Sequence, residues 1–187
     1  TYGQDLYDAM LAAIAGAQHQ VLFETYLWKG DEVGERFKRA LSEAAGRGVE
    51  VYAIYDAFGN LVVRPQFKRF GPRLRVLAYP IYNAGWRFFD IRRYGRDHRK
   101  LLIVDDEVAF VGGYNIGSAY ATEWRDTHAR ITGPAVADLK RAFADFWNLN
   151  RTKRFQMPRN RMQPLLTDTG RGWEPQMRIH RNVPRQW

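Results

Sequence analysis

The chain has 187 residues, enough for one domain of ordinary size, and its 45% hydrophobic and 14% aromatic content suits a sizeable core, which excludes disorder throughout. The absence of cysteine excludes disulfides, thiolate zinc sites and thiol catalysis. A formal charge of +9 favours an anionic partner, although charge alone does not choose between a lipid surface and nucleic acid.

The predicted elements begin with a helix over residues 6–17, where apolar side chains recur at helical spacing. Residues 21–28 are strand-favouring and nearly all apolar, which predicts a buried and parallel strand. Asp31 is expected to cap the next helix, which ends near Gly46, and residues 49–56 form the following strand. This strand-helix-strand order predicts two parallel neighbours joined by a right-handed crossover.

Later elements follow in the same way from periodicity and turn residues. They are a weak helix at 61–70, a strand at 74–79, two strands at 100–104 and 108–113 around a turn at 105–107, a strand at 127–131, and an amphipathic helix at 134–147. Between them, residues 80–97 form a long aromatic and basic loop, of a length that usually carries a function. The fold class is therefore α/β, with a mixed, largely parallel sheet flanked by helices on both faces.

Periodic patterning ends near residue 150. Residues 1–150 are expected to form the domain, and residues 151–187 a basic, proline-containing arm or linker with a short strand at 177–180. No apolar run is long enough to span a membrane, and the first residues do not resemble a signal peptide. Because the chain lacks an initiator Met and stops abruptly at Trp187, we expect it to be a segment of a longer protein.

One motif concentrates the chemistry of the chain. It has the form HxKx4Dx6GGxN and comprises His98, Lys100, Asp105, Gly112, Gly113 and Asn115. Alternation along a strand puts the His98 imidazole and the Lys100 ammonium on the same face. A neutral imidazole can attack phosphorus to give a phosphohistidine, and the ammonium can neutralise the nonbridging oxygens. The motif therefore favours phosphoryl transfer without a metal or cofactor.

The rest of the motif is expected to support this chemistry. Asn115 donates an amide hydrogen bond to the phosphate oxygens, while Gly112 and Gly113 let the backbone approach the phosphate. Asp105 lies beyond the pocket and is expected to pin its turn through hydrogen bonds from the side chain to the backbone. Basic residues lead into His98, and we expect Arg96 and Arg99 to attract an anionic substrate.

This motif resembles the signature of the phospholipase D superfamily, particularly its bacterial cardiolipin synthase branch. The likeness extends over roughly residues 5–150. It includes Glu24-Thr25-Tyr26 with Asp31 and Gly34, Arg47-Gly48-Val49, Asp56-Ala57-Phe58-Gly59, Glu123 to His128, and Gly133 to Val136. The resemblance implies a phospholipase D-like fold for the 1–150 domain.

The resemblance also implies a carboxylate that orients the His98 imidazole. Asp126 takes that role, with Glu123 as its rival, and a plain surface charge is the alternative for either residue. His128, two residues after Asp126, is expected to be a packed core or edge residue rather than a catalytic one.

The family's site uses two His-x-Lys motifs, because attack and departure occur on opposite faces of phosphorus. This chain contains one. We expect the second to lie in a missing half of the parent chain, and a homodimer that shares one site is the alternative.

The resemblance thus implies a bacterial phosphatidyltransferase of cardiolipin synthase type, acting on phosphatidylglycerol at a membrane surface and located peripherally at the cytoplasmic membrane or in the cytoplasm. Hydrolysis of phospholipids is an enzymatic alternative. A single-motif, dimeric phosphodiesterase acting on DNA is a second, and a non-catalytic half that only binds anionic lipid is a third.

Overall fold

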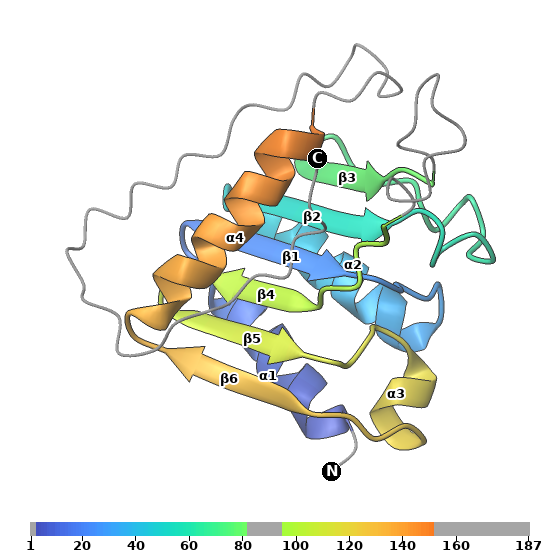
Figure 1. Ribbon diagram of the computed structural model, residues 1–187, viewed down its shortest axis with the longest axis horizontal. Helices are drawn as coiled ribbons and strands as arrows, with labels where there is room; N and C mark the ends of the chain where they lie inside the picture. The colour runs from blue at the N-terminus through green and yellow to red at the C-terminus, as the bar shows by residue number, and fades with distance from the viewer. Residues whose placement is uncertain (1–2, 82–94, 152–187) are drawn as a thin grey trace.

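The computed structural model describes residues 3–81 and 95–151, which form a six-stranded sheet between two layers of helices (Figure 1). The elements run in the order α1 (Gln4–Gly16), β1 (Gln20–Thr25), α2 (Glu32–Gly46), β2 (Glu50–Asp56), β3 (Leu74–Tyr79), β4 (Leu101–Val104), β5 (Val108–Gly112), α3 (Ser118–Thr122), β6 (His128–Thr132) and α4 (Ala135–Asn150). The predicted α/β fold is confirmed.

The sheet has the strand order β3-β2-β1-β4-β5-β6. Strands β1, β2 and β3 are parallel, whereas β4 runs antiparallel to β1 and continues through β5 to β6 as an antiparallel meander. The sheet is mixed, as expected, but the antiparallel pairings outnumber the parallel ones. The three-residue turn at 105–107 is too short for a parallel crossover, so it makes β4 and β5 antiparallel.

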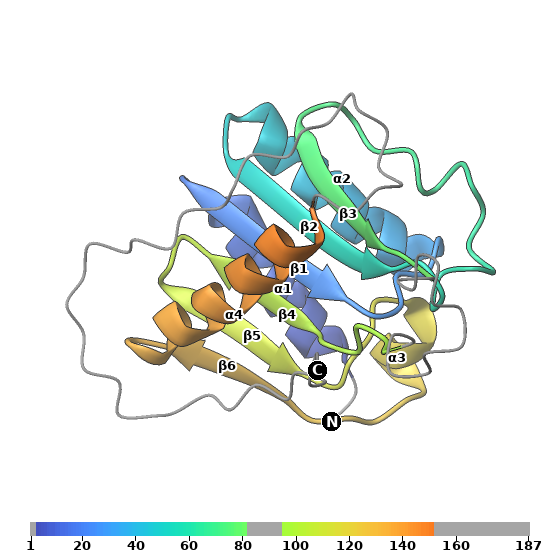
Figure 2. The same cartoon turned by 45° about the horizontal axis from the view of Figure 1, so that its top comes forward.

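Helices cover both faces of the sheet (Figures 1 and 2). Alternation along β1 sends Val21 and Phe23 into the core beneath α1 and α2, and Leu22 into the core beneath α4. Tyr7 and Phe37 fill the first core, while Phe143 and Trp147 of α4 fill the second.

Helix α2 begins where the sequence predicts. The Asp31 carboxylate accepts a hydrogen bond from Gly34 N at 3.0 Å and another from Ser118 N at 2.7 Å, so one side chain caps α2 and holds the start of α3. A side chain at Gly34 would place its Cβ 1.6 Å from Lys29 O, so only glycine fits this approach.

The helix predicted at 61–70 was wrong. The segment instead forms consecutive turns with hydrogen bonds from Val63 N to Asn60 O and from Phe67 N to Arg64 O. Pro65 lacks the N–H that a continuous helix would need. The apolar spacing reflects Val63 and Phe67, which are buried against the α2 side of the sheet.

The remaining differences are small. The first predicted strand ends at Thr25 rather than Trp28, while α4 extends to Asn150, and the short helix α3 was not expected. The interior of the 80–97 loop and the 151–187 arm, with its predicted strand at 177–180, lie outside the described residues except at their ends. None of the helices in the described part combines the length and apolar character needed to cross a membrane.

Candidate active site

Ends of β1, β2, β4, β5 and β6 meet at one edge of the sheet. Parallel β1 and β2 finish there at Thr25 and Asp56, and because β4 is antiparallel to β1 it begins there at Leu101. The end of β5 at Gly112 pairs with the start of β6 at His128 at the same edge. The His98-x-Lys100 segment, directly before β4, is therefore placed among the loops that follow β1, β2 and β5.

His98 and Lys100 contact each other directly at this edge. Lys100 Nζ lies 3.0 Å from His98 Nδ1 and donates to the His98 carbonyl oxygen at 2.6 Å. The His98 residue is exposed, whereas Lys100 is 4% exposed. Although residues 95–100 precede the strand rather than belong to it, the two side chains share one face as predicted.

Desolvation lowers the pKa values of both His98 and Lys100. Desolvation, aided by the charge of Lys100, lowers the pKa of His98 against the opposing influence of Asp97, Asp56 and Asp126, which favours the neutral imidazole at neutral pH. Desolvation likewise lowers the pKa of Lys100 to about 8. The ammonium thus remains the main form at pH 7.

Tyr26 forms one wall of the pair and was not assigned a role from the sequence. Its ring centroid lies 4.7 Å from that of His98, and Lys100 Nζ sits 5.3 Å from the same centroid. The Tyr26 carbonyl accepts from Asn60 Nδ2 at 2.9 Å. Its position immediately after β1 was the available signal, since side chains that follow sheet strands gather at that edge.

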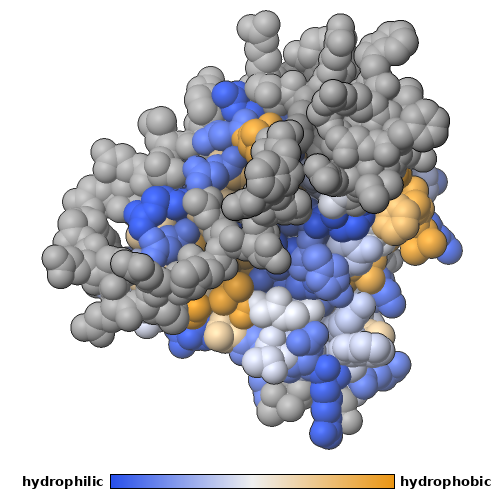
Figure 3. Space-filling model, viewed as in Figure 1, coloured by the Kyte–Doolittle hydropathy of each residue, from blue (hydrophilic) through white to orange (hydrophobic). Residues whose placement is uncertain are grey.

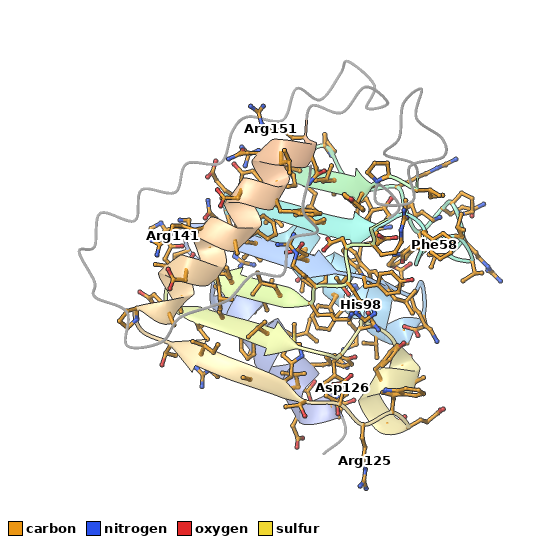
Figure 4. The ribbon with its side chains drawn as sticks, viewed as in Figure 1. Phe58, His98, Arg125, Asp126, Arg141 and Arg151 are labelled. Atoms are coloured by element: carbon orange, nitrogen blue, oxygen red, sulfur yellow. The ribbon has the colours of Figure 1, made fainter. Side chains whose placement is uncertain are left out.

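Asp126 lies at the same edge as His98 (Figure 4), close enough for its charge to raise the pKa values of His98 and Lys100. Its Oδ1 accepts a hydrogen bond from Thr127 N at 2.7 Å. Asp126 and His98 are both described residues, and no hydrogen bond joins the carboxylate to the imidazole ring. The carboxylate therefore acts on His98 through space in this arrangement. Glu123, its rival, is exposed at the end of α3.

At both glycines of the motif, an added Cβ would collide with neighbouring residues. A Cβ at Gly113 would lie 2.1 Å from Asp126 Oδ1, and a Cβ at Gly112 would lie 2.3 Å from Thr127 O. The space next to the glycines is thus filled by the start of β6 and by the Asp126 carboxylate. Glycine at 113 is what allows Asp126 to approach the site.

Asn115 is 9% exposed and is oriented by the backbone of the β1–α2 connection. Its Oδ1 accepts from Leu27 N at 3.1 Å, and its carbonyl oxygen accepts from the Tyr7 hydroxyl. With Oδ1 engaged, Nδ2 is the part of the amide suited to an incoming acceptor.

Arg99, predicted to bind substrate, points to the other side of the sheet. Its guanidinium pairs with Glu24 and with Asp97 at 3.1 Å, and it lies 4.0 Å from the centroid of the Phe146 ring in α4. Alternation places Arg99 opposite His98 and Lys100, and its role in binding substrate stays a prediction. Burial and the neighbouring charge of Asp97 raise the pKa of Glu24, which makes Arg99 its compensating partner.

Arg96, the other predicted substrate-binding arginine, is held by the protein. It donates to Ile81 O at 2.6 Å, lies 3.9 Å from Asp56 Oδ1, and covers the Phe58 ring at 5.3 Å. Asp56 in turn accepts from Phe58 N, Gly59 N and Asp97 N, so this buried carboxylate ties the loop after β2 to the segment that carries His98. Sequence reasoning gave Asp56 no such role.

Asp105 lies at the opposite end of β4 from the site. Its carboxylate accepts from the backbone N–H groups of Gln18, His19 and Gln20 at 2.7–2.8 Å. It therefore fixes the α1–β1 connection rather than only its own turn. Burial alone would raise the pKa of Asp105, but these three donors outweigh it and hold the pKa below its usual value.

His128 is a packed residue. Its ring lies 6.2 Å from that of Tyr114, and desolvation lowers its pKa to about 4, which keeps it neutral. Within residues 3–81 and 95–151, no group of three or more His, Asp or Glu side chains is arranged to hold a metal ion.

Comparison with known proteins assigns the chain to a family. Residues 10–147 match the family model described as "Cardiolipin synthase, PLD-like domain". Cardiolipin synthase A of Pseudomonas aeruginosa is 36% identical over 154 residues, covering 78% of this chain and 31% of that protein. Cardiolipin synthase of Listeria monocytogenes is 34% identical over 152 residues, with 78% and 32% covered. The chain spans about a third of the length of these relatives.

Solved structures show the same fold at lower sequence identity. The phospholipase D family member Nuc from Salmonella typhimurium superposes with a TM-score of 0.58 at 19% identity, covering 75% of this chain and 86% of Nuc. NucT from Helicobacter pylori gives 0.61 at 18% identity, with 76% and 88% covered. Phosphatidylserine synthase from Haemophilus influenzae gives 0.59 at 17% identity, with 79% and 35% covered. By its family match and its relatives, the chain belongs to the phospholipase D superfamily, as a cardiolipin synthase-like domain.

Proposed function

We propose that this domain supplies one half of a phosphatidyltransferase site of cardiolipin synthase type, with His98 as the nucleophile. The observation that carries the proposal is the contact between a neutral imidazole and a mainly charged ammonium at the sheet edge, 3.0 Å apart. The relatives' names supply the substrate class, an anionic phospholipid.

The first half-reaction opens the contact between His98 and Lys100. A phosphate oxygen draws the Lys100 ammonium away from His98 Nδ1, and the ring proton then sits on Nδ1, favoured by the negative charge of Asp126. The Nε2 lone pair attacks phosphorus of phosphatidylglycerol, the bond from phosphorus to the headgroup glycerol oxygen breaks, and glycerol leaves with a proton from a general acid. Lys100 and the Asn115 amide stabilise the nonbridging oxygens.

The second half-reaction returns the enzyme to its starting state. A hydroxyl of a second phosphatidylglycerol attacks the phosphohistidine, its proton passes to the same acid-base group, and the P–N bond breaks to release cardiolipin. The acid-base group is a second His-x-Lys, supplied by the rest of a parent chain or by a second copy. The share of the relatives' length that this chain leaves uncovered supports the first arrangement.

The test is the formation of cardiolipin and glycerol from phosphatidylglycerol by a protein or dimer that contains both motifs. We expect His98→Asn to abolish both products, while His19→Asn, which replaces an exposed histidine in the α1–β1 connection, retains them. Equal product from His98→Asn and wild type would remove the basis of the proposal. If phosphatidic acid forms instead of cardiolipin, water is the acceptor and the enzyme is a phospholipid hydrolase.

A second candidate is a dimeric, single-motif phosphodiesterase that acts on DNA. It is favoured by the formal charge of +9, which suits a polyanionic substrate. Cleavage of plasmid DNA in the presence of EDTA, lost in His98→Asn, would support this candidate over lipid transfer.

A further inference from the structure

The described residues leave five large apolar side chains exposed. They are Phe58 (49% exposed), Leu61 (57%), Val62 (91%), Trp124 (60%) and Leu149 (50%). Three of these five lie in one short stretch after β2, here called the loop tip (Phe58, Leu61 and Val62). Figure 3 shows hydrophobic side chains at the right margin, on the side where this loop projects in Figure 1.

The loop tip lies beside the catalytic edge. Phe58 N donates to Asp56 at the end of β2, and the Arg96 guanidinium, two residues before His98, lies over the Phe58 ring. Figure 4 places Phe58 on one side of His98, and Asp126 with its neighbour Arg125 on the other. Trp124, which is 60% exposed, directly precedes Arg125 in the chain.

The protein holds the loop tip outward. Asn60 is 1% exposed, accepts from Trp28 N at 2.9 Å and donates to Tyr26 O and Asp56 O. On the other side of the tip, Val63 is buried at 7% exposure. Leu61 and Val62 are therefore presented to the outside between two anchored residues, at the cost of exposing apolar surface.

The charge around the loop tip is of one sign. Arg64 and Arg69 are exposed, Lys68 donates to Asn60 O at 2.7 Å, and the stretch from Ala57 to Arg73 contains no acidic residue. An apolar tip bordered by cations complements a surface whose interior is apolar and whose headgroups are anionic.

We propose that the loop tip inserts into the interfacial layer of an anionic phospholipid bilayer and brings the His98 edge to the lipid headgroups. The lipid identity rests on the proposed function. A bilayer fits better than a protein partner, because three side chains on a narrow tip fall far short of the roughly 800 Å² per partner of a stable protein interface. Insertion by about 5–10 Å is what such an apolar element achieves at a membrane surface.

The chain contains no cysteine, so a single introduced thiol can report the depth of the tip. Val62→Cys of this chain, labelled with an environment-sensitive fluorophore, is mixed with vesicles of phosphatidylcholine alone or with phosphatidylglycerol. We expect a blue shift of the emission with phosphatidylglycerol vesicles. Leu149→Cys, a matched exposed apolar position at the end of α4, should give none.

A second variant measures the contribution to binding. We expect Leu61→Asp combined with Val62→Asp to reduce partitioning onto phosphatidylglycerol vesicles by about tenfold or more, because it replaces apolar area with charge of the wrong sign. Equal partitioning of variant and wild type, or an equal shift at Leu149→Cys, overturns the proposal. A shift that grows with protein concentration without vesicles overturns it as well, by assigning the tip to a protein interface.

Turnover of dispersed short-chain phosphatidylglycerol separates this inference from the proposed function. If the wild type turns over that substrate but the label shows no insertion, the membrane docking is wrong and the transferase assignment stands. If the label shows insertion but no form of phosphatidylglycerol is turned over, the membrane docking stands and the transferase assignment is wrong.

Discussion

At the scale of single residues, the site depends on opposite protonation states in two adjacent side chains. Desolvation lowers the pKa of both His98 and Lys100. In the proposed mechanism the active form has a neutral imidazole and a charged ammonium, so it exists between the two pKa values. This places the working range between a value below the ordinary 6.5 of His98 and about 8 for Lys100.

We therefore expect a bell-shaped dependence of kcat/KM on pH. The rate rises as His98 loses its proton, at a pH below 6.5, and falls near pH 8 as Lys100 loses its charge. Lys100→Arg keeps its charge to much higher pH, so whatever activity it retains should lack the fall near pH 8. The measurement is kcat/KM for dispersed substrate across pH, and a basic limb that persists in Lys100→Arg would assign that limb to another group.

Gly113 provides a second test at this scale. A Cβ at this position would lie 2.1 Å from Asp126 Oδ1, so Gly113→Ala must displace the carboxylate. We expect kcat to fall by about 100-fold, a loss typical of misplacing a group at an active site by about 1 Å. Gly46→Ala, where a Cβ meets nothing within 4 Å, is the control. Wild-type kcat in Gly113→Ala would show that the position of Asp126 does not matter.

At the scale of elements, periodicity predicted most of the helices and strands because each buries one face or both. The sequence predicted β1 and β2 from their continuous apolar runs, because both strands are buried on both faces. It predicted α2 from the Asp31 cap and the apolar spacing. The segment at 61–70 failed because two buried side chains, Val63 and Phe67, imitate helical spacing in a chain that Pro65 breaks into turns. Spacing alone does not report backbone hydrogen bonding.

The same limit applies to the site. Alternation correctly predicted that the side chains of His98 and Lys100 lie together, because the two residues stand two positions apart in one segment. It could not reveal Tyr26 or Asp56, because they reach the site from other strands and only the sheet order brings them together. The basic composition that suggested Arg99 as a substrate-binding residue does not report the direction of its side chain, which pairs with Glu24.

The Asp105 contact yields a prediction about element packing. Asp105→Asn keeps a residue that tolerates the left-handed backbone there (φ 51°) but loses the charge and one acceptor for the Gln18–Gln20 N–H groups. We expect the free energy of unfolding to fall by about 2 kcal/mol at pH 7, measured by urea denaturation.

The pH dependence of that loss has a defined sign. The pKa of Asp105 is lowered in the folded protein, so its stabilisation is present above the unfolded value near 3.8 and is lost as pH falls through the lower folded value. The difference between variant and wild type should therefore vanish in acid. Glu107→Gln, an exposed neighbour, is the control, and equal losses in both variants would show that the Asp105 contact is not specific.

At the scale of the whole molecule, the proposed mechanism needs more than the one motif in this chain. In-line displacement needs groups on opposite faces of phosphorus, and in that mechanism His98 serves one face. The chain covers about a third of the length of the cardiolipin synthases it matches, which leaves ample sequence in such proteins for a second His-x-Lys.

We accordingly expect the isolated chain to be inactive when held monomeric, and to become active when a second motif is supplied. The measurement is turnover of phosphatidylglycerol against protein concentration, with sedimentation to define the assembly. Activity per chain that rises with dimer content would identify a second copy as the source of the motif. Full activity in a demonstrated monomer would contradict the two-motif requirement.

The most direct test of the account is a search for the covalent intermediate. The protein with both motifs is incubated briefly with phosphatidylglycerol, unfolded in cold denaturant at neutral pH to preserve the P–N bond, and mapped by peptide mass spectrometry. We expect a phosphatidyl adduct on His98 that is absent from His98→Asn. Rapid turnover with an adduct found only at a different residue, or undiminished turnover by His98→Asn, would contradict it.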